Sequence, residues 1–342
     1  MSIEAVAFAI PGPITTRTGG YAYDRRLIAG LRACGLAIHP LAWPDGFPTP
    51  TAAELAAAAR SLSELPDGRI VIVDGLAYGA IPDLAEAEGR RLRLVALVHH
   101  PLALETGAPS SLAAAERRAL RQATGVIATS ETTAETLRRE YDVPVERLLV
   151  APPGTDPAPP AARTGCHILS LGSVTPRKGH DVLVAALSRI TDLPWGCTIA
   201  GSLARAPDTV AQLRLQIDAA GLADRIALAG EVEDATALYA SADLFVLASR
   251  HEGFGMAFAE ALARGLPVIG TSAGAVPSVV PPEAGALVPP DDPAALAAAI
   301  ARLLTDPAAR DIASAAALRA AARLPRWDAT VSAVVELLGR LG

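Results

Sequence analysis

The sequence is poor in lysine, because only one of its 30 basic residues, Lys178, is not an arginine. It also has no excess of positive charge: the net charge is −6, and division near residue 160 leaves −3 on each part. This balance excludes a protein that binds nucleic acid mainly by electrostatic attraction. Because the chain uses arginine for every other basic residue, we infer that the compact ammonium of Lys178 is needed at its position.

Cysteine is scarce as well, and the three residues Cys34, Cys166 and Cys197 are widely separated. They form neither a disulfide framework nor a zinc spacing, so we expect reduced thiols in a cytoplasmic protein. No uninterrupted apolar run approaches the roughly 18 residues that suggest a membrane-spanning helix. The N-terminal stretch lacks a basic region and reaches Pro11 early, so we expect a first strand there and not a signal peptide.

A chain of 342 residues with 51% hydrophobic residues favours two domains. Apolar runs alternate with helical patterns along its length, which predicts an α/β protein with parallel sheets covered on both faces. A Pro-rich stretch between Ala151 and Arg163 predicts a linker. We therefore place domains at 1–155 and 164–326, with the linker at 156–163. Strands are expected at Ala5–Ile10, Leu36–Leu41, Ile70–Val73, Leu94–Val98, Val126–Ala128, Leu148–Val150, His167–Val174, Cys197–Ala200, Ile226–Leu228, Leu244–Ala248 and Val268–Thr271.

The most informative stretch runs from the strand at Leu244–Ala248 through a polar turn into a helix opening at Gly255. Glu252 and Glu260 would lie about 12 Å apart along a helix axis, which suits an extended ligand better than one metal ion. Between them, backbone N–H groups at a helix N-terminus form a natural phosphate cradle. These groups belong to Gly253, Phe254, Gly255 and Met256.

This stretch, with its S-R-x-E-G-F-G turn, resembles the Glu-x7-Glu motif of retaining glycosyltransferases with the GT-B fold, in particular glycosyltransferase family 4. The resemblance implies that Glu252 contacts the donor sugar, with a discussed role as nucleophile, and that Glu260 contacts the ribose. The alternative from the residues alone is that Glu252 caps the helix and Glu260 lies on its solvated face.

Arg177 and Lys178 are expected at the carboxyl end of a strand, beside Gly179 and a helix start, where two cations would neutralise a diphosphate. Their G-x4-R-K-G pattern resembles the family's pyrophosphate-binding turn; an exposed surface turn is the alternative. Because no D-x-D motif occurs in a fitting position, we expect no metal and no other cofactor. The nucleotide sugar would be a co-substrate.

Two further places precede the linker. Gly19 and Gly20 lie before a helix start and suit an anion, or else form an ordinary mobile loop. The resemblance places such a glycine pair near the diphosphate. His99 and His100 follow a strand, where an imidazole could contact a sugar hydroxyl or exchange protons. The resemblance favours His99, although a structural histidine under the loop is the alternative and the roles of the pair stay open.

The resemblance also implies that the nucleotide base is held by backbone groups around Val232 and that the helix at 327–342 packs back on the first domain. Ser278 stands where many family members have a glutamate, which puts that contact in doubt. Arg117, Arg118 and Arg121 could touch anionic lipid or an anionic acceptor. A solvated face balanced by Glu116 and neighbouring acids is the preferred interpretation, so peripheral membrane contact is not indicated.

Together these features predict a GT-B protein, with two Rossmann-like domains facing across a cleft. It would be a metal-independent, hexosyltransferase-like enzyme that moves a sugar from a UDP- or GDP-sugar to an unidentified acceptor, which is a glycan, a lipid-linked molecule or a small molecule. The rivals are a nucleotide-sugar epimerase and a catalytically silent nucleotide-sugar-binding subunit.

Overall fold

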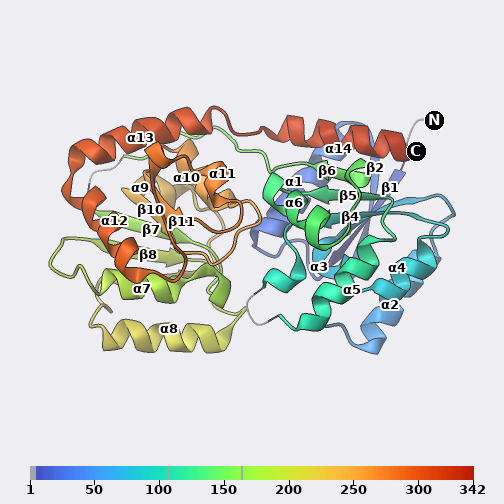
Figure 1. The fold of residues 1–342 in the computed structure, drawn as a ribbon, viewed down its shortest axis with the longest axis horizontal. Coiled ribbons are helices and arrows are strands. Elements are labelled where there is room, and N and C mark those ends of the chain that lie inside the picture. Colours follow the sequence, from blue (N-terminus) through green and yellow to red (C-terminus); the bar gives the residue numbers. More distant parts are fainter. Residues whose placement is uncertain (1–4, 106–107, 163–164) are drawn as a thin grey trace. The chain divides into compact units, whose positions relative to one another are not determined.

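The computed structural model describes residues 5–105, 108–162 and 165–342. It contains two six-stranded sheets in which every strand pair is parallel. The chain divides into two compact units (Figure 1). Unit 1 comprises residues up to Thr16, Gly20–Gly154 and Pro325–Gly342, and unit 2 comprises Arg17–Gly19 and Thr155–Leu324. The predicted linker boundary at residues 163 and 164 lies outside the described residues.

The sheet of unit 1 has the strand order β2-β1-β3-β4-β5-β6. Its central strands are buried on both faces, which explains why they are continuous apolar runs in the sequence. Because the chain leaves β1 for β2 on one side and returns to β3 on the other, the switch point lies between β1 and β3. The strands are β1 Ala5–Pro11, β2 Ala37–Trp43, β3 Ile70–Asp74, β4 Arg93–Val98, β5 Gly125–Ala128 and β6 Leu148–Val150.

Helices connect these strands, and α1 shows how sequence pattern positions them. Its buried residues Asp24, Leu27, Ile28 and Leu31 recur at helical spacing and form one inward face. Elsewhere Thr51 caps α2 in a capping box with Glu54. The helices are α1 Gly19–Ala33, α2 Ala52–Ser63, α3 Gly75–Tyr78, α4 Pro82–Glu88, α5 Ser110–Leu120 and α6 Glu131–Glu140, with 3-10 turns η1 Leu102–Leu104 and η2 Val145–Arg147.

The sheet of unit 2 has the order β12-β11-β10-β7-β8-β9, so its switch point lies between β7 and β10. The strands are β7 His167–Leu171, β8 Gly196–Ala200, β9 Ile226–Gly230, β10 Leu244–Leu247, β11 Val268–Thr271 and β12 Gly285–Val288. The helices are α7 His180–Leu187, α8 Pro207–Ala219, α9 Thr236–Ser241, α10 Met256–Ala263, α11 Val276–Val279, α12 Pro293–Thr305 and α13 Pro307–Ala321, with 3-10 turns η3 Pro176–Lys178 and η4 Pro282–Ala284.

Every strand expected from the sequence is present, with small shifts at the ends, and the α/β prediction is confirmed. The strand β12 was not predicted. It has only four residues, begins at a glycine and follows a Pro-rich turn, so its pattern is too short for a periodicity to show. It pairs with β11 along its whole length and completes the edge of the second sheet.

The last helix, α14 Trp327–Leu341, packs on unit 1 (Figure 1). The Thr330 hydroxyl donates a hydrogen bond to the Pro152 carbonyl at 2.6 Å. The Trp327 ring lies 5.5 Å from the Tyr23 ring, and the Arg26 guanidinium lies 5.0 Å from its centroid. Among the described residues, no helix is long and apolar enough to cross a membrane.

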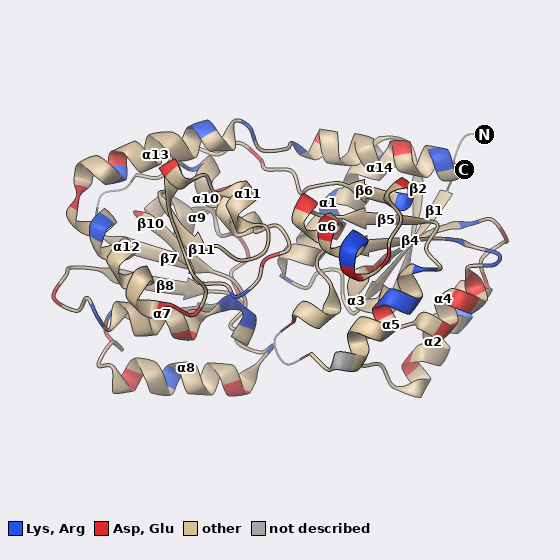
Figure 2. Ribbon diagram, in the orientation of Figure 1, with Lys and Arg blue, Asp and Glu red and all other residues tan. Residues whose placement is uncertain are grey.

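Charges of both signs lie together over α4 and α5 (Figure 2). Arg118 pairs with Asp83 and Glu86, and Arg121 contacts Asp142 at 3.2 Å. The interpretation of these arginines as a balanced, solvated face is therefore confirmed. Glu116 does not take part as expected, because it is 1% exposed and accepts a hydrogen bond from the Leu102 N–H.

The close approach of α14 to α1 gives a stability prediction. A Cβ at Gly30 would collide with the Val331 side chain, whose β-branched group has one favoured helical rotamer and cannot swing away. We expect Gly30→Ala to lower the free energy of unfolding by about 1–3 kcal/mol despite the higher helix propensity of alanine. Urea unfolding followed by circular dichroism measures this.

The matched control is Gly339→Ala on α14, where an added Cβ meets nothing within 4 Å. There, the propensity gain of up to about 1 kcal/mol should leave the protein unchanged or more stable. Equal effects of the two substitutions would contradict the packing argument.

Candidate functional site

The candidate site of unit 2 is built from loops that follow β7 and β10, the two strands at its switch point. Arg177 and Lys178 form the end of η3 after β7, and Glu252 follows β10. Because β7 and β10 are hydrogen-bonded neighbours, residues 74 positions apart in the sequence come together. This is the edge of a parallel sheet where ligands bind.

Lys178 and Glu252 form a short ion pair, with 2.6 Å between Nζ and Oε1. The Ser249 hydroxyl donates to the same oxygen at 2.6 Å. Arg177 lies 3.6 Å from Oε2 of Glu252 and donates to the His251 carbonyl at 2.9 Å. Glu252 is 6% exposed, so a buried carboxylate is held by two cations and a hydroxyl. The interpretation of the turn as an exposed surface feature is wrong.

Two glycines allow the cation loop to approach the sheet. A Cβ at Gly172 would lie 3.2 Å from Cδ and Cε of Lys178, so a side chain there would displace the ammonium stem. Gly179 has φ +64°, and a Cβ there would also collide with the Ala248 carbonyl. The loop geometry therefore depends on glycine at position 179, and the placement of the Lys178 stem is sensitive to a side chain at position 172.

The electrostatics of Glu252 follow from its partners. Burial acts to raise the pKa of its carboxyl, but the charges of Lys178 and Arg177 outweigh burial and lower the pKa to about 2. Glu252 is therefore ionised near neutral pH and accepts hydrogen bonds without offering a proton. It does not cap the following helix, because the N-cap position is Gly255. The helix-capping alternative is wrong.

Glu260 lies in the middle of α10 and is half-buried. Its Oε2 accepts a hydrogen bond from the Tyr239 hydroxyl at 3.0 Å. Burial raises the pKa of Glu260, and this hydrogen bond together with the charge of Arg264 opposes that rise. The alternative that Glu260 lies on a solvated face is therefore wrong.

The predicted phosphate cradle lies between the two glutamates. Helix α10 begins at Met256, one residue later than expected, after Gly255 with φ +95°. Its first backbone hydrogen bond runs from the Phe258 N–H to the Gly255 carbonyl at 3.0 Å. The N–H groups of Met256 and its successor precede that bond and are not used by the helix. Gly253 and Phe254 lie in the turn that connects Glu252 to this helix start.

Of the other predicted positions in unit 2, Val232 lies in the loop after β9 and is half-buried. Ser278 lies in α11, and its hydroxyl donates to the Ala275 carbonyl at 2.7 Å. His180, which was not singled out from the sequence, is 2% exposed at the start of α7. Burial and the nearby Lys178 charge lower its pKa to about 4, so it is neutral at physiological pH.

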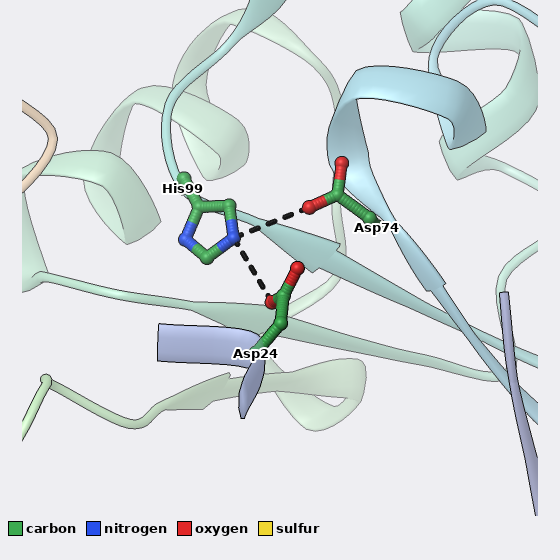
Figure 3. A group of neighbouring side chains, drawn as sticks. All are labelled: Asp24, Asp74 and His99. Carbon is green, nitrogen blue, oxygen red and sulfur yellow. Dashed lines mark ion pairs between the residues drawn. The ribbon is translucent and has the colours of Figure 1, made fainter. Parts of the chain in front are cut away.

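In unit 1 the two histidines have different partners. His99 Nε2 lies 3.3 Å from Asp24 Oδ1 and 3.3 Å from Asp74 Oδ2 (Figure 3). His100 Nε2 lies 2.7 Å from Glu105 Oε1. Burial would lower the pKa of His99, but the two carboxylates outweigh it and raise that pKa. Burial, with the charge of Asp74, raises the pKa of Asp24.

The Gly19–Gly20 pair opens α1 beside this cluster. A Cβ at Gly20 would lie 3.2 Å from Cδ2 of His99, so the glycine lets the helix backbone approach the imidazole ring. The loop before it is tied down, because Arg25 donates hydrogen bonds to the Ile14 and Thr16 carbonyls at 2.6 and 3.0 Å. These two contacts argue against the mobile-loop alternative.

Sequence reasoning missed Asp24, Asp74 and Tyr239. Asp74 carried a readable signal, since it directly follows the apolar run of β3 at the carboxyl edge. Asp24 carried one as well, because it occupies the inward apolar face of α1. Tyr239 had no comparable signal, because its contact with Glu260 joins two helices.

Comparison with known proteins agrees with this architecture. The family "Glycosyltransferase Family 4" matches residues 14–159, and "Glycosyl transferases group 1" matches residues 165–306. Sucrose-phosphate synthase of Thermosynechococcus elongatus superposes with a TM-score of 0.84 at 20% identity over 99% of both chains. HepE of Anabaena, solved with UDP and glucose, gives 0.77 at 19% identity over 99% of this chain and 100% of that chain.

Curated relatives are also similar in sequence. A D-inositol 3-phosphate glycosyltransferase of Xylanimonas cellulosilytica is 31% identical over 67% of this chain and 60% of its own length. The lipopolysaccharide core biosynthesis mannosyltransferase LpcC of Rhizobium leguminosarum bv. viciae is 34% identical over 55% of this chain and 56% of its own length. The chain thus spans less than two thirds of the length of these relatives.

The structural likenesses confirm the GT-B fold, a class of two parallel α/β sheets in separate units. Within that class, the two matched family regions together span most of the chain. The chain belongs to the group 1 glycosyltransferases of family 4.

The buried ion pair of Glu252 predicts a pH dependence of stability. Its folded pKa of about 2 is below the value of an unfolded glutamate, so its contribution is present above about pH 4.5 and is lost as pH falls toward 2. We expect the difference in unfolding free energy between the wild type and Glu252→Gln to narrow over this interval. Urea titrations at several pH values measure it.

The other carboxylates are present in both the wild type and Glu252→Gln, so their titration largely cancels in the difference between the two unfolding free energies. The control is the same glutamate substitution in a Lys178→Met background, where the pH-dependent part of the difference should be smaller. A difference that stays constant from pH 5 to pH 2 in both backgrounds would show that the pair does not depress the pKa of Glu252.

Proposed function

We propose that the chain is a retaining glycosyltransferase that moves a sugar from a UDP- or GDP-sugar to an acceptor hydroxyl. The observation that carries this is the Arg177, Lys178 and Glu252 network at the switch point of the second sheet. Family membership supports it, and HepE, which shares the fold, was solved with UDP and glucose. A cytoplasmic location, expected from three separate cysteines, is part of the proposal.

In the proposed donor site, Arg177 and Lys178 bind the diphosphate together with the helix start at Gly253–Met256. Two charge-assisted contacts and a helix N-terminus neutralise the negative charge that develops on the leaving group. Lys178 is paired with Glu252 in the structure. Binding of the donor therefore shifts the ammonium from the carboxylate toward the phosphates and frees Glu252 to accept hydrogen bonds from the sugar.

The chemical step breaks the bond between the anomeric carbon and the phosphate oxygen and forms a bond to the acceptor oxygen. The acceptor proton passes to the departing phosphate oxygen, and the nucleoside diphosphate leaves. Glu252 stays ionised because its pKa is about 2, so its role is to stabilise positive charge on the sugar and to orient it. Glu260 holds the ribose hydroxyls, and backbone groups near Val232 hold the base.

Unit 1 is assigned to the acceptor, with His99 or His100 near the sugar. A loop after β4 carries both histidines, and Gly20 lies against the His99 ring. The glycine pair Gly19–Gly20 is assigned to the diphosphate on the strength of the family resemblance. The two curated relatives act on different molecules, so they single out no acceptor.

The direct test starts with thermal shift measurements against a panel of nucleotide sugars. Donors that stabilise the protein are then incubated with candidate acceptors, and transferred hexose is detected by mass spectrometry. Turnover of the donor to an isomer without any acceptor would support an epimerase instead. Donor binding without transfer or hydrolysis by the wild type would support a catalytically silent binding subunit.

Lys178 provides a first prediction for donor binding. A hydrogen bond between charged groups contributes about 1.5–3 kcal/mol, so Lys178→Met should weaken UDP or GDP binding about ten-fold or more. Isothermal titration calorimetry measures this. The charge-matched control is Arg189→Met, an exposed arginine beyond the far end of α7, which should leave affinity nearly unchanged. Equal affinities in both folded variants would remove Lys178 from the donor site.

Isothermal titration calorimetry also tests the expectation that no metal ion is needed to bind the diphosphate. Affinity for the nucleoside diphosphate should be equal in EDTA and in excess Mg2+ or Mn2+. A ten-fold gain with Mg2+ or Mn2+ would show that the cation pair does not suffice.

The two glutamates give a further prediction. Glu260→Gln should weaken binding of the bare nucleoside diphosphate about ten-fold, because a charged acceptor for the ribose hydroxyls is lost. Glu252→Gln should not weaken it, since the substitution releases Lys178 from its ion pair, but it should lower turnover of the full donor. The opposite pattern, lost affinity in Glu252→Gln and only lost rate in Glu260→Gln, would reverse the assignment.

A further inference from the structure

The buried cluster of Asp24, Asp74 and His99 contains polar atoms that no hydrogen bond satisfies. Asp24 is 0% exposed, and neither of its carboxylate oxygens has a hydrogen-bond partner among the described residues. The Nε2 atom of His99 is also buried and without a hydrogen-bond partner among the described residues. A buried carboxylate without a close donor is costly, and the His99 ring, 3.3 Å from an oxygen of each aspartate, makes no short hydrogen bond to either.

The distances in the cluster are those of long ion pairs and not of short hydrogen bonds. Nε2 of His99 lies 3.3 Å from an oxygen of each aspartate, whereas charge-assisted N–H···O bonds are about 2.7–2.9 Å long. One N–H group can be shared between two carboxylates only as a bifurcated bond, which is longer and weaker to each oxygen. By contrast, ligand atoms about 2.0–2.1 Å from a tetrahedral Zn2+ lie about 3.3–3.4 Å from each other.

We propose that Asp24, Asp74 and His99 bind a divalent transition metal ion, with Zn2+ the best-fitting ion. Their three ligand atoms lie within 4.8 Å of one another, and the side chains come from α1, the end of β3 and the loop after β4 (Figure 3). Two carboxylates and a neutral imidazole balance a charge of +2. Imidazole suits zinc, iron, copper and nickel better than Mg2+ or Ca2+.

The surroundings hold the ligands in place. The Leu76 N–H donates to Oδ1 of Asp74 at 2.7 Å, which leaves Oδ2 directed at His99. The Gly20 backbone lies against the imidazole ring and restricts its rotation. The three ligand atoms lie among buried groups, since Asp24 is 0% and Asp74 3% exposed and Nε2 of His99 is a buried atom.

The metal would join α1 to the ends of β3 and β4 at the switch point of the first sheet. It would fix the orientation of His99, which otherwise has two competing partners. The metal ligands belong to unit 1, whereas Arg177 and Lys178, the cations assigned to the diphosphate, belong to unit 2. A metal ion in unit 1 is compatible with the expectation that no metal bridges the donor phosphates. The inference does not rest on the proposed function.

The experiment uses the full chain without a histidine tag. Protein is stripped with a chelator, dialysed against Zn2+, and analysed by plasma mass spectrometry, which should give about one zinc per chain. Reconstitution with Co2+ should give visible absorption bands of a tetrahedral site. Zinc should also raise the unfolding temperature, because the ion binds the folded state.

The variants test the ligands one by one. Loss of an outer partner of a metal ligand lowers affinity about 10–100-fold, so Asp24→Asn should weaken Zn2+ binding at least 100-fold. His99→Gln, which alters a partly exposed ligand, serves if Asp24→Asn does not fold. The controls are the adjacent His100→Gln and Glu116→Gln, another buried acid of unit 1, and both should retain the ion.

Absence of bound zinc in the wild type, or equal binding by Asp24→Asn, His99→Gln and the controls, would overturn the proposal. The cluster would then be an imidazolium shared by two carboxylates. Titration of nucleoside diphosphate on the same samples separates the two ideas, because donor binding in unit 2 depends on Lys178. If the protein binds zinc but no nucleoside diphosphate, the metal site is supported and the donor site is contradicted. If it binds the nucleoside diphosphate but no zinc, the donor site is supported and the metal site is contradicted.

Discussion

The short ion pair between Lys178 and Glu252 is the interaction on which the second unit depends. Removal of two charges from water is costly, and well-packed apolar residues of similar size would often serve stability as well or better. A chain with one lysine that places it against a buried carboxylate has therefore kept these charges for a reason other than stability. The glycines at 172 and 179 serve the same pair, because a side chain at 172 would press on the Lys178 stem and one at 179 would collide with the Ala248 carbonyl.

Both sheets are parallel and each has a switch point, although their strand orders differ, and the two switch points present opposite chemistry. In unit 2 the neighbouring strands β7 and β10 lead to two cations around one carboxylate. In unit 1 helix α1, the end of β3 and the loop after β4 contribute two carboxylates around one imidazole. The loops at the carboxyl ends of parallel strands therefore provide a position for a site without fixing its chemistry. The side chains on these loops decide whether the edge of the sheet attracts an anion or a cation.

What could be predicted from the sequence follows from this architecture. Strands buried on both faces are continuous apolar runs, so eleven of the twelve strands, and with them the loops carrying Lys178 and Glu252, could be located. The contact between those two residues could not, because it depends on which strands are neighbours. Asp24 was readable as a charge on an apolar helical face, but its partners come from β3 and β4 and only the fold brings them together.

The neutral state of His180 completes the electrostatic argument for the second unit. Its ring is buried beside Lys178, and burial with that charge lowers its pKa to about 4. With His180 uncharged, the network of Lys178, Arg177 and Glu252 carries a net charge of +1. A charged His180 would add a third cation to this network, although neither of its buried ring nitrogens has a hydrogen-bond partner among the described residues. Burial of a neutral imidazole thus keeps the excess positive charge on the two long side chains, which can move toward a phosphate, and off the rigid start of α7.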